Sequence, residues 1–190
     1  LRRKLSQLAS QHAQSFDVTR IIPQYARLLR KMKLMIFVPT MRMGGAERNT
    51  ALLLEHLNRQ LVDVELAMVF DKEIFYPIPK DVLIHIVERQ ETNSQQRVGK
   101  IELPSHLRRY EHGMIFLEKT ALKLADLAQR QQADIIFSTQ LWTSIIATLA
   151  RRYIPNSIRI IVMVDVHPST LLAHNKYNEL YSYLMREHFN

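Results

Sequence analysis

The sequence predicts an α/β protein with a Rossmann-like parallel sheet and helices on both faces of that sheet. Three observations support this prediction. Short, continuously apolar runs are typical of strands that are buried on both faces. Amphipathic helical patterns alternate with these runs along the chain. A glycine pair follows the first run and directly precedes a helical pattern, so that a strand, a tight turn and a helix start follow one another.

Five segments are predicted to form the strands. The first is the apolar run Leu-Met-Ile-Phe-Val at residues 34–38, which Pro39 ends. The other four combine β-branched and apolar residues in the same way. They are residues 64–70, 82–87, 134–138 and 158–164.

Helices are predicted between and after these strands. In the first helix, Ala46, Thr50, Leu54 and Leu61 recur at helical spacing and predict one buried face. The predicted helices are residues 46–61, 114–128, 141–153 and 171–189. Residues 88–113 are polar and show no sustained period, so we expect a long loop there that is functional or mobile.

A basic helical segment, residues 1–31, precedes the domain at residues 32–190. The net charge of the 190-residue chain is +8. Residues 1–33 hold eight basic side chains against Asp17 alone, whereas the remainder holds 18 basic and 17 acidic side chains. Such a segment can contact anionic lipid head groups. The body of the domain lacks clustered basic and aromatic residues, so we expect no nucleic-acid partner.

The composition of the chain limits the cellular compartments and the kinds of chemistry that we expect for it. It has no cysteine, which excludes a disulfide framework and thiolate chemistry. No apolar run approaches the roughly 18 residues that span a bilayer, and no signal peptide is visible. We therefore expect a cytoplasmic protein whose leading segment can lie peripheral to a membrane. The eight histidines show no metal-ligand spacing, so no metal site is predicted.

The glycine pair Gly44–Gly45 is the strongest local signal of a binding site. Glycine adopts positive φ readily and has no Cβ, so we expect a tight turn that leaves room for a ligand. The helix behind it brings free N–H groups and a positive dipole end to the same point, which suits a phosphate or a polar sugar. The alternative is that the pair only permits a tight strand-to-helix turn.

Other polar residues are predicted at the same edge of the sheet, where ligands collect in such folds. Residues 138–140 and 165–167 lie at the carboxyl ends of two of the predicted strands. Arg48 can clamp a phosphate or a carboxylate, or it is a solvated surface arginine. His167 is a candidate functional residue, with a hydrogen-bonded loop histidine as the alternative. No Gly-x-Ser-x-Gly motif supports a serine nucleophile.

The pattern around the glycines departs from two well-known phosphate-binding motifs. Met43 and Ala46 do not fit the Gly-x-Gly-x-x-Gly dinucleotide fingerprint, and no Lys-Ser/Thr pair marks a P-loop. Asp71, at the end of the second predicted strand, could still bind a ribose. An NAD(P)-dependent oxidoreductase and a non-catalytic Rossmann-like binding module therefore remain alternatives.

Residues 33–40, Lys-Leu-Met-Ile-Phe-Val-Pro-Thr, followed by Gly-Gly-Ala-Glu-Arg at residues 44–48, resemble the start of family 4 glycosyltransferases of GT-B fold. The resemblance continues through residues 133–138 and 160–167. It covers residues 33–190, which correspond to the amino-terminal, acceptor-side domain of that family. Residues 1–31 resemble the closing helices of a similar enzyme, as in two transferases joined head to tail; an ordinary amphipathic extension is the alternative.

The resemblance implies a retaining, hexosyltransferase-type enzyme of polysaccharide or glycolipid biosynthesis, without metal or cofactor. It would transfer a sugar from a nucleotide-sugar to a sugar or lipid-linked acceptor. Gly44 and Gly45 would lie against the phosphate and sugar of the donor. His167 would face the transferred sugar as the catalytic histidine. Independently of the resemblance, Arg48 is a candidate contact to acceptor or phosphate. The donor domain with its carboxylate pair is absent from this sequence, so we expect this fragment to be inactive by itself.

Overall fold

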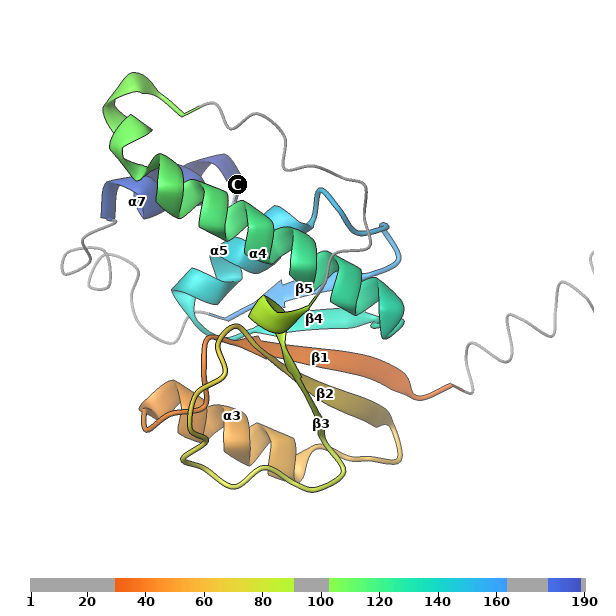
Figure 1. Ribbon diagram of the computed structural model, residues 1–190. Helices are drawn as coiled ribbons and strands as arrows, with labels where there is room; N and C mark the ends of the chain where they lie inside the picture. The colour runs from red at the N-terminus through yellow and green to blue at the C-terminus, as the bar shows by residue number, and fades with distance from the viewer. Residues whose placement is uncertain (1–29, 91–102, 164–177, 189–190) are drawn as a thin grey trace, which may run out of the picture. The chain divides into compact units, whose positions relative to one another are not determined.

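A sheet of five parallel strands lies at the centre of the domain, in the order β3-β2-β1-β4-β5 (Figure 1). The computed structural model describes residues 30–90, 103–163 and 178–188. Each predicted apolar run overlaps one strand, which confirms the Rossmann-like α/β fold. The strands are β1 (Met32–Val38), β2 (Val62–Met68), β3 (Leu83–Ile86), β4 (Ile135–Ser138) and β5 (Arg159–Val162).

Helices cover both faces of the sheet, as predicted (Figure 1). One face carries α3, and the other carries α4 and α5, with α7 packed against α5. Two short 3₁₀ helices, η1 and η2, precede α4. The helical elements are α3 (Gly45–His56), η1 (Val87–Arg89), η2 (Ser105–Tyr110), α4 (Glu111–Arg130), α5 (Leu141–Ala150) and α7 (Asn178–His188).

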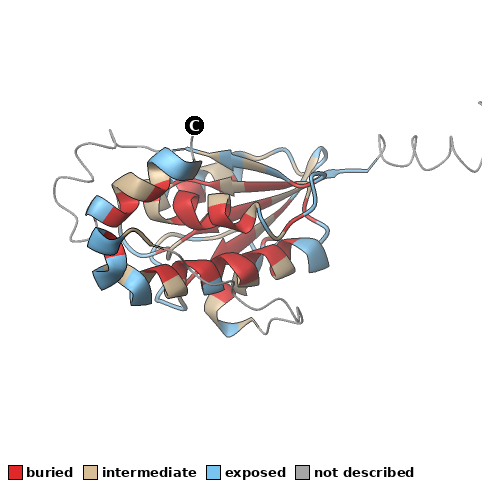
Figure 2. Ribbon diagram, turned by 90° about the horizontal axis from the view of Figure 1, so that it is seen from above, coloured by how far each residue is buried: buried red, intermediate tan, exposed pale blue. Residues whose placement is uncertain are grey.

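The sheet separates two apolar layers, and β1 contributes to both. Ile36 and Val38 pack with α3, whereas Met35 and Phe37 pack with α4 and α5. All four side chains are buried, and burial of each contributes about 1.5–3 kcal/mol. Figure 2 shows buried residues along the strands and on the inward sides of the helices. This two-sided burial explains why the run at residues 34–38 is continuously apolar rather than alternating.

Helix α3 ends earlier than the sequence predicts. Leu57 is extended, and the Arg59 guanidinium donates hydrogen bonds to the carbonyl oxygens of Leu54 and Leu57 near the end of the helix. Strand β2 then begins at Val62. Leu61 therefore lies in the turn before β2, and 66 % of its surface is exposed. Its assignment to the buried helix face was wrong, because the next strand begins before another helical turn can form.

The predicted loop at residues 88–113 is also wrong at both ends. Helix η1 extends to Arg89, and η2 and the first turn of α4 occupy residues 105–113. The Leu107 amide donates a hydrogen bond to the Pro104 carbonyl at 2.8 Å, and the Leu107 side chain is fully buried. A single buried residue thus anchors η2, too little to produce a helical period in the sequence. Residues 91–102 lie outside the described part of the chain.

The chain divides into two compact units, residues 1–31 and residues 32–190. Apart from Arg30 and Lys31, the first unit lies outside the described residues, and with it the predicted leading helices. The beginning of the predicted helix at residues 171–189 also lies outside them. Its later part is present as α7.

A buried carboxylate joins α4 to the segment that follows α5. Glu118 is only 2 % exposed. Its Oε1 accepts a hydrogen bond from Arg152 at 2.6 Å, and its Oε2 accepts one from the Tyr153 hydroxyl at 3.0 Å. A buried charge is tolerated only when it is paired and hydrogen-bonded, as it is here.

We expect Glu118→Ala to lower the free energy of unfolding by about 1.5–3 kcal/mol, because both hydrogen bonds to a charged group are lost. Urea denaturation measures this change. Glu55→Ala, at an exposed position of α3, is the matched control and should stay within about 0.5 kcal/mol of the parent. Equal stability of the two variants would contradict a stabilising role for Glu118.

Because of Tyr153, the free energy of unfolding should depend on pH in the alkaline range. Burial, together with the neighbouring Glu118 carboxylate, raises the pKa of the Tyr153 phenol above its ordinary value of 10.0. As the pH rises, the unfolded chain releases the phenol proton at a lower pH than the folded chain does. The free energy of unfolding therefore falls as the pH rises through the pKa that Tyr153 has in the folded state. Between about pH 9 and pH 11, we expect Tyr153→Phe to lose stability less steeply than the parent in urea denaturation. Parallel curves would show that this phenol is not responsible.

Candidate functional site

The strand order creates a topological switch point between β1 and β4. Helix α3 follows β1 on one face of the sheet, and α5 follows β4 on the other. In open parallel sheets, ligands bind beyond the carboxyl ends of the strands at such a point. We call this region the switch-point edge and define it by Gly44, Gly45, Glu47, Thr139 and Gln140.

A hydrogen bond joins the two sides of the switch-point edge. Gln140 Nε2 donates to Glu47 Oε1 at 3.0 Å, across 93 residues of sequence. Gly44 is the N-cap of α3 and Gln140 is the N-cap of α5. Neither provides a side-chain cap for the first-turn N–H groups. Both helix starts therefore retain backbone donors that can bind a phosphate or a hydroxyl oxygen.

The two glycines differ in what surrounds them. Gly44 has φ 179° and ψ 163°, which is extended backbone, and neither glycine has positive φ. The expected positive-φ turn was wrong. A Cβ on Gly44 would overlap the Glu47 carboxylate, whereas a Cβ on Gly45 would meet no atom within 4 Å. Gly44 thus leaves space for Glu47, and Gly45 borders open space.

The remaining predicted site residues have different positions. Arg48 is exposed in the first turn of α3 and forms no ion pair with the part of the chain that the structure describes. It is close in sequence to the glycines and available to a ligand. The predicted catalytic residue, His167, lies outside the described residues. The structure therefore brings Gly44, Gly45 and Arg48 into one turn and does not describe His167.

Buried hydroxyl groups fix the start of α5 against β4. Ser138 Oγ donates a hydrogen bond to Thr143 Oγ1 at 2.9 Å, and Ser144 Oγ lies 3.3 Å from Ser138 Oγ. Thr139 is 3 % exposed, and its Oγ1 has no hydrogen-bond partner among the described residues. Sequence reasoning placed residues 138–140 at this edge without assigning them a role. The Ser-Thr-Gln run after an apolar strand was the available signal.

Asp71, the residue that kept a nicotinamide cofactor under consideration, forms an ion pair with Arg89. Arg89 belongs to η1, after β3, so the pair joins the ends of two neighbouring strands. A ribose would have to compete with this guanidinium for the carboxylate. The pairing therefore weakens the dinucleotide-binding interpretation.

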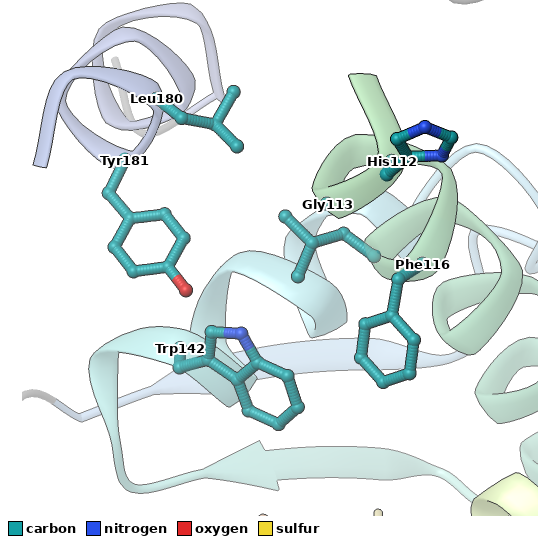
Figure 3. A pocket seen from close by; sticks show the side chains of 7 residues that line it. His112, Gly113, Phe116, Trp142, Leu180 and Tyr181 are labelled. Atoms are coloured by element: carbon teal, nitrogen blue, oxygen red, sulfur yellow. The ribbon is translucent and has the colours of Figure 1, made fainter. Parts of the chain in front are cut away.

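An aromatic pocket of about 360 Å³ lies at the first turns of α4, α5 and α7 (Figure 3). Helix α4 contributes His112, Gly113, Phe116 and Leu117, α5 contributes Trp142, and α7 contributes Leu180 and Tyr181. Sequence reasoning missed this pocket. Its lining comes from three helices, and no local motif links them.

Three near-parallel rings form the aromatic part of this region. The ring centroids of Phe70, Phe116 and Trp142 are 5.8–6.0 Å apart, with interplanar angles of 17–18°. Phe70 follows β2 and stacks on the two pocket residues. Stacked aromatic pairs contribute about 0.5–1.5 kcal/mol beyond the area that they bury.

An ion pair lies beside the pocket. Arg109, just before α4, forms an ion pair with Glu179 in the first turn of α7. This hydrogen bond raises the pKa of the Arg109 guanidinium. The pair thus joins the two helix starts that flank the pocket.

No protein-family model matches the sequence, and no curated protein matches it either. Among the residues that the structure describes, no helix has the length and apolar character needed to cross a membrane. Within the same ranges, no group of three His, Cys, Asp or Glu side chains is placed to hold a metal ion.

The two glycines should respond differently to alanine. Gly45→Ala introduces a methyl group into open space at the first position of α3, so we expect unchanged stability or a gain of up to about 1 kcal/mol. Gly44→Ala must displace Glu47 and break its hydrogen bond to Gln140, which should cost about 0.5–1.5 kcal/mol. Urea denaturation measures both changes.

A double-mutant cycle with Gln140→Ala isolates this hydrogen bond from any difference in N-cap preference. Gly44→Ala should lower the free energy of unfolding by less when Gln140 is already replaced by alanine. An unchanged cost would show that the glycine does not act through the Glu47–Gln140 contact.

Proposed function

We propose that the chain is the acceptor-side half of a retaining GT-B glycosyltransferase that transfers a sugar from a nucleotide-sugar to an acceptor. The observation that carries the proposal is the Gly-Gly-Ala-Glu-Arg turn at the switch-point edge. There, the glycine-bounded start of α3 is joined to the start of α5 by the Glu47–Gln140 hydrogen bond. The sequence resemblance to family 4 glycosyltransferases supports the same function.

The chemistry of sugar transfer suits this arrangement. As the bond between the sugar and the phosphate breaks, negative charge develops on the phosphate oxygens of the leaving nucleotide. Backbone N–H groups and the dipole at a helix start stabilise such charge without further reorganisation. In this proposal, open space beside Gly45 admits the phosphate or sugar, and Arg48 offers a cation. His167, by resemblance, faces the transferred sugar.

The proposal includes a second domain that binds the nucleotide, and a sugar or lipid-linked acceptor on the side described here. It also places the enzyme in the cytoplasm, with the cationic leading segment in contact with anionic lipid. Reaction would need no metal or other cofactor. Without its donor domain, residues 1–190 would be inactive.

Two alternatives are less well supported. A nicotinamide-dependent oxidoreductase would use a dinucleotide fingerprint, which the sequence lacks, and a free acidic side chain after β2, whereas Asp71 is paired with Arg89. A non-catalytic Rossmann-like module could share the same edge and would differ in performing no transfer.

Activity should be measured on the longest polypeptide of the same reading frame that joins this chain to a donor domain. We expect transfer of labelled hexose from at least one UDP- or GDP-sugar, with retained anomeric configuration and in the presence of EDTA. Calorimetric titration of the same polypeptide with NAD⁺ and NADP⁺ tests the oxidoreductase alternative. Micromolar dinucleotide binding without sugar transfer would overturn the proposal, and the absence of either activity would favour a binding module.

In that polypeptide, Gly45→Val should reduce transfer by at least about 100-fold, because its side chain occupies space intended for the ligand. Thermal unfolding should change little, since no atom lies within 4 Å of the new Cβ. Leu52→Val, at an exposed position of the same helix, is the control and should retain activity. Near-parental activity of Gly45→Val would limit the glycine to a structural role.

A further inference from the structure

The aromatic pocket and the switch-point edge share the first turn of α5. Trp142 lies two residues after Gln140, the N-cap residue that contacts Glu47. Helices that connect parallel strands begin at the carboxyl edge of the sheet, so the pocket opens at the same edge as the glycine turn. A ligand in the pocket would thus lie beside the proposed donor site.

The size of the pocket fits a small molecule. Its volume of about 360 Å³ lies within the range of roughly 300–1,000 Å³ that is usual for such sites. Leu117 and Leu180 form buried apolar surface, and Phe116 and Trp142 are only partly buried. Side chains that are partly exposed can still gain contact area from a ligand.

Three polar groups border the pocket, and the exposed His112 imidazole lies at its rim (Figure 3). They are the His112 imidazole, the Trp142 indole N–H and the Tyr181 hydroxyl (Figure 3). In Figure 3, the Tyr181 hydroxyl points from α7 toward Trp142. Within the described ranges, neither His112 nor the indole N–H has a hydrogen-bond partner. Both are therefore available to a ligand with hydroxyl groups.

This combination defines the chemistry of the ligand. A purely hydrocarbon ligand would leave His112 and the Trp142 indole N–H without a partner, at a cost for each donor that is removed from water. An anion would need a cation in the pocket, whereas the lining contains neither lysine nor arginine, and the neighbouring Arg109 is paired with Glu179. A pyranose has an apolar C–H face that can pack on an aromatic ring and hydroxyl groups around its rim.

We propose that the aromatic pocket binds a neutral hexopyranose ring, stacked on Trp142 and Phe116 and hydrogen-bonded through His112 and the indole N–H. The assignment of that ring as the sugar of the acceptor rests on the proposed transferase function. The binding of the ring itself does not. The first turn of α5 would then position the acceptor next to the switch-point edge.

Trp142 is the only tryptophan of the chain, so intrinsic fluorescence reports directly on this pocket. The 190-residue chain is titrated with the methyl α-glycosides of glucose, mannose and galactose, and separately with hexan-1-ol, a mainly apolar probe that has one hydroxyl group and no sugar ring. We expect at least one glycoside to change the emission saturably, with half-saturation on the order of 1 mM. Hexan-1-ol should produce no saturable change.

The matched variants are His112→Ala and His56→Ala, both exposed histidines on helices. Loss of one hydrogen bond should weaken glycoside binding about three- to tenfold in His112→Ala. His56→Ala, on α3, should bind like the parent. Phe116→Ala should weaken binding further by removing a stacking surface, with circular dichroism used to verify that the variant is folded.

Three results would overturn the inference: no response to any glycoside, a saturable response to hexan-1-ol alone, or a glycoside response that His112→Ala and Phe116→Ala leave unchanged. The proposed function fails separately, because this titration contains no nucleotide-sugar. Glycoside binding without transferase activity would support the sugar-binding pocket and contradict the proposed transferase function. Transferase activity without a glycoside response would support the proposed transferase function and contradict sugar binding in the pocket.

Discussion

The parallel pairing of β1 with neighbours on both sides is the constraint on which the rest of the domain depends. β1 pairs with β2 along its whole length and with β4 over residues 34–37. Parallel neighbours must be connected by crossovers, and these crossovers have a fixed hand. Because the chain proceeds from β1 in one direction and returns to its other side at β4, α3 and α5 are directed to opposite faces. Their first turns nevertheless meet at one edge.

That edge combines two kinds of surface. On the α3 side, the glycine turn offers backbone donors and open space beside Gly45. On the opposite face, aromatic side chains surround a pocket whose polar groups are few. The first turn of α5 connects the two surfaces, and the buried Ser138–Thr143 hydrogen bond holds this turn against β4. In the proposed transferase, polar and apolar parts of a substrate would be recognised side by side.

For the glycine turn, the prediction from sequence gave the right position and the wrong backbone conformation. The run Gly44–Gly45 after an apolar strand was sufficient to locate a candidate site. Its backbone proved to be extended, and Gly44 matters through the carboxylate of Glu47, which occupies the space where a side chain would lie. Since Glu47 is held by Gln140 from another strand, no local pattern contained this information.

The sequence by itself determined the fold class, the five strands and the location of the glycine turn, because these depend on apolar runs and local periodicity. Only the tertiary structure decided the exposure of Leu61, the pairing of Asp71 with Arg89 and the assembly of the aromatic pocket. Each depends on which segments become neighbours in the sheet and its helical layers. Strand order is set by the packing of the whole chain, and the spacing of residues along one segment does not encode it.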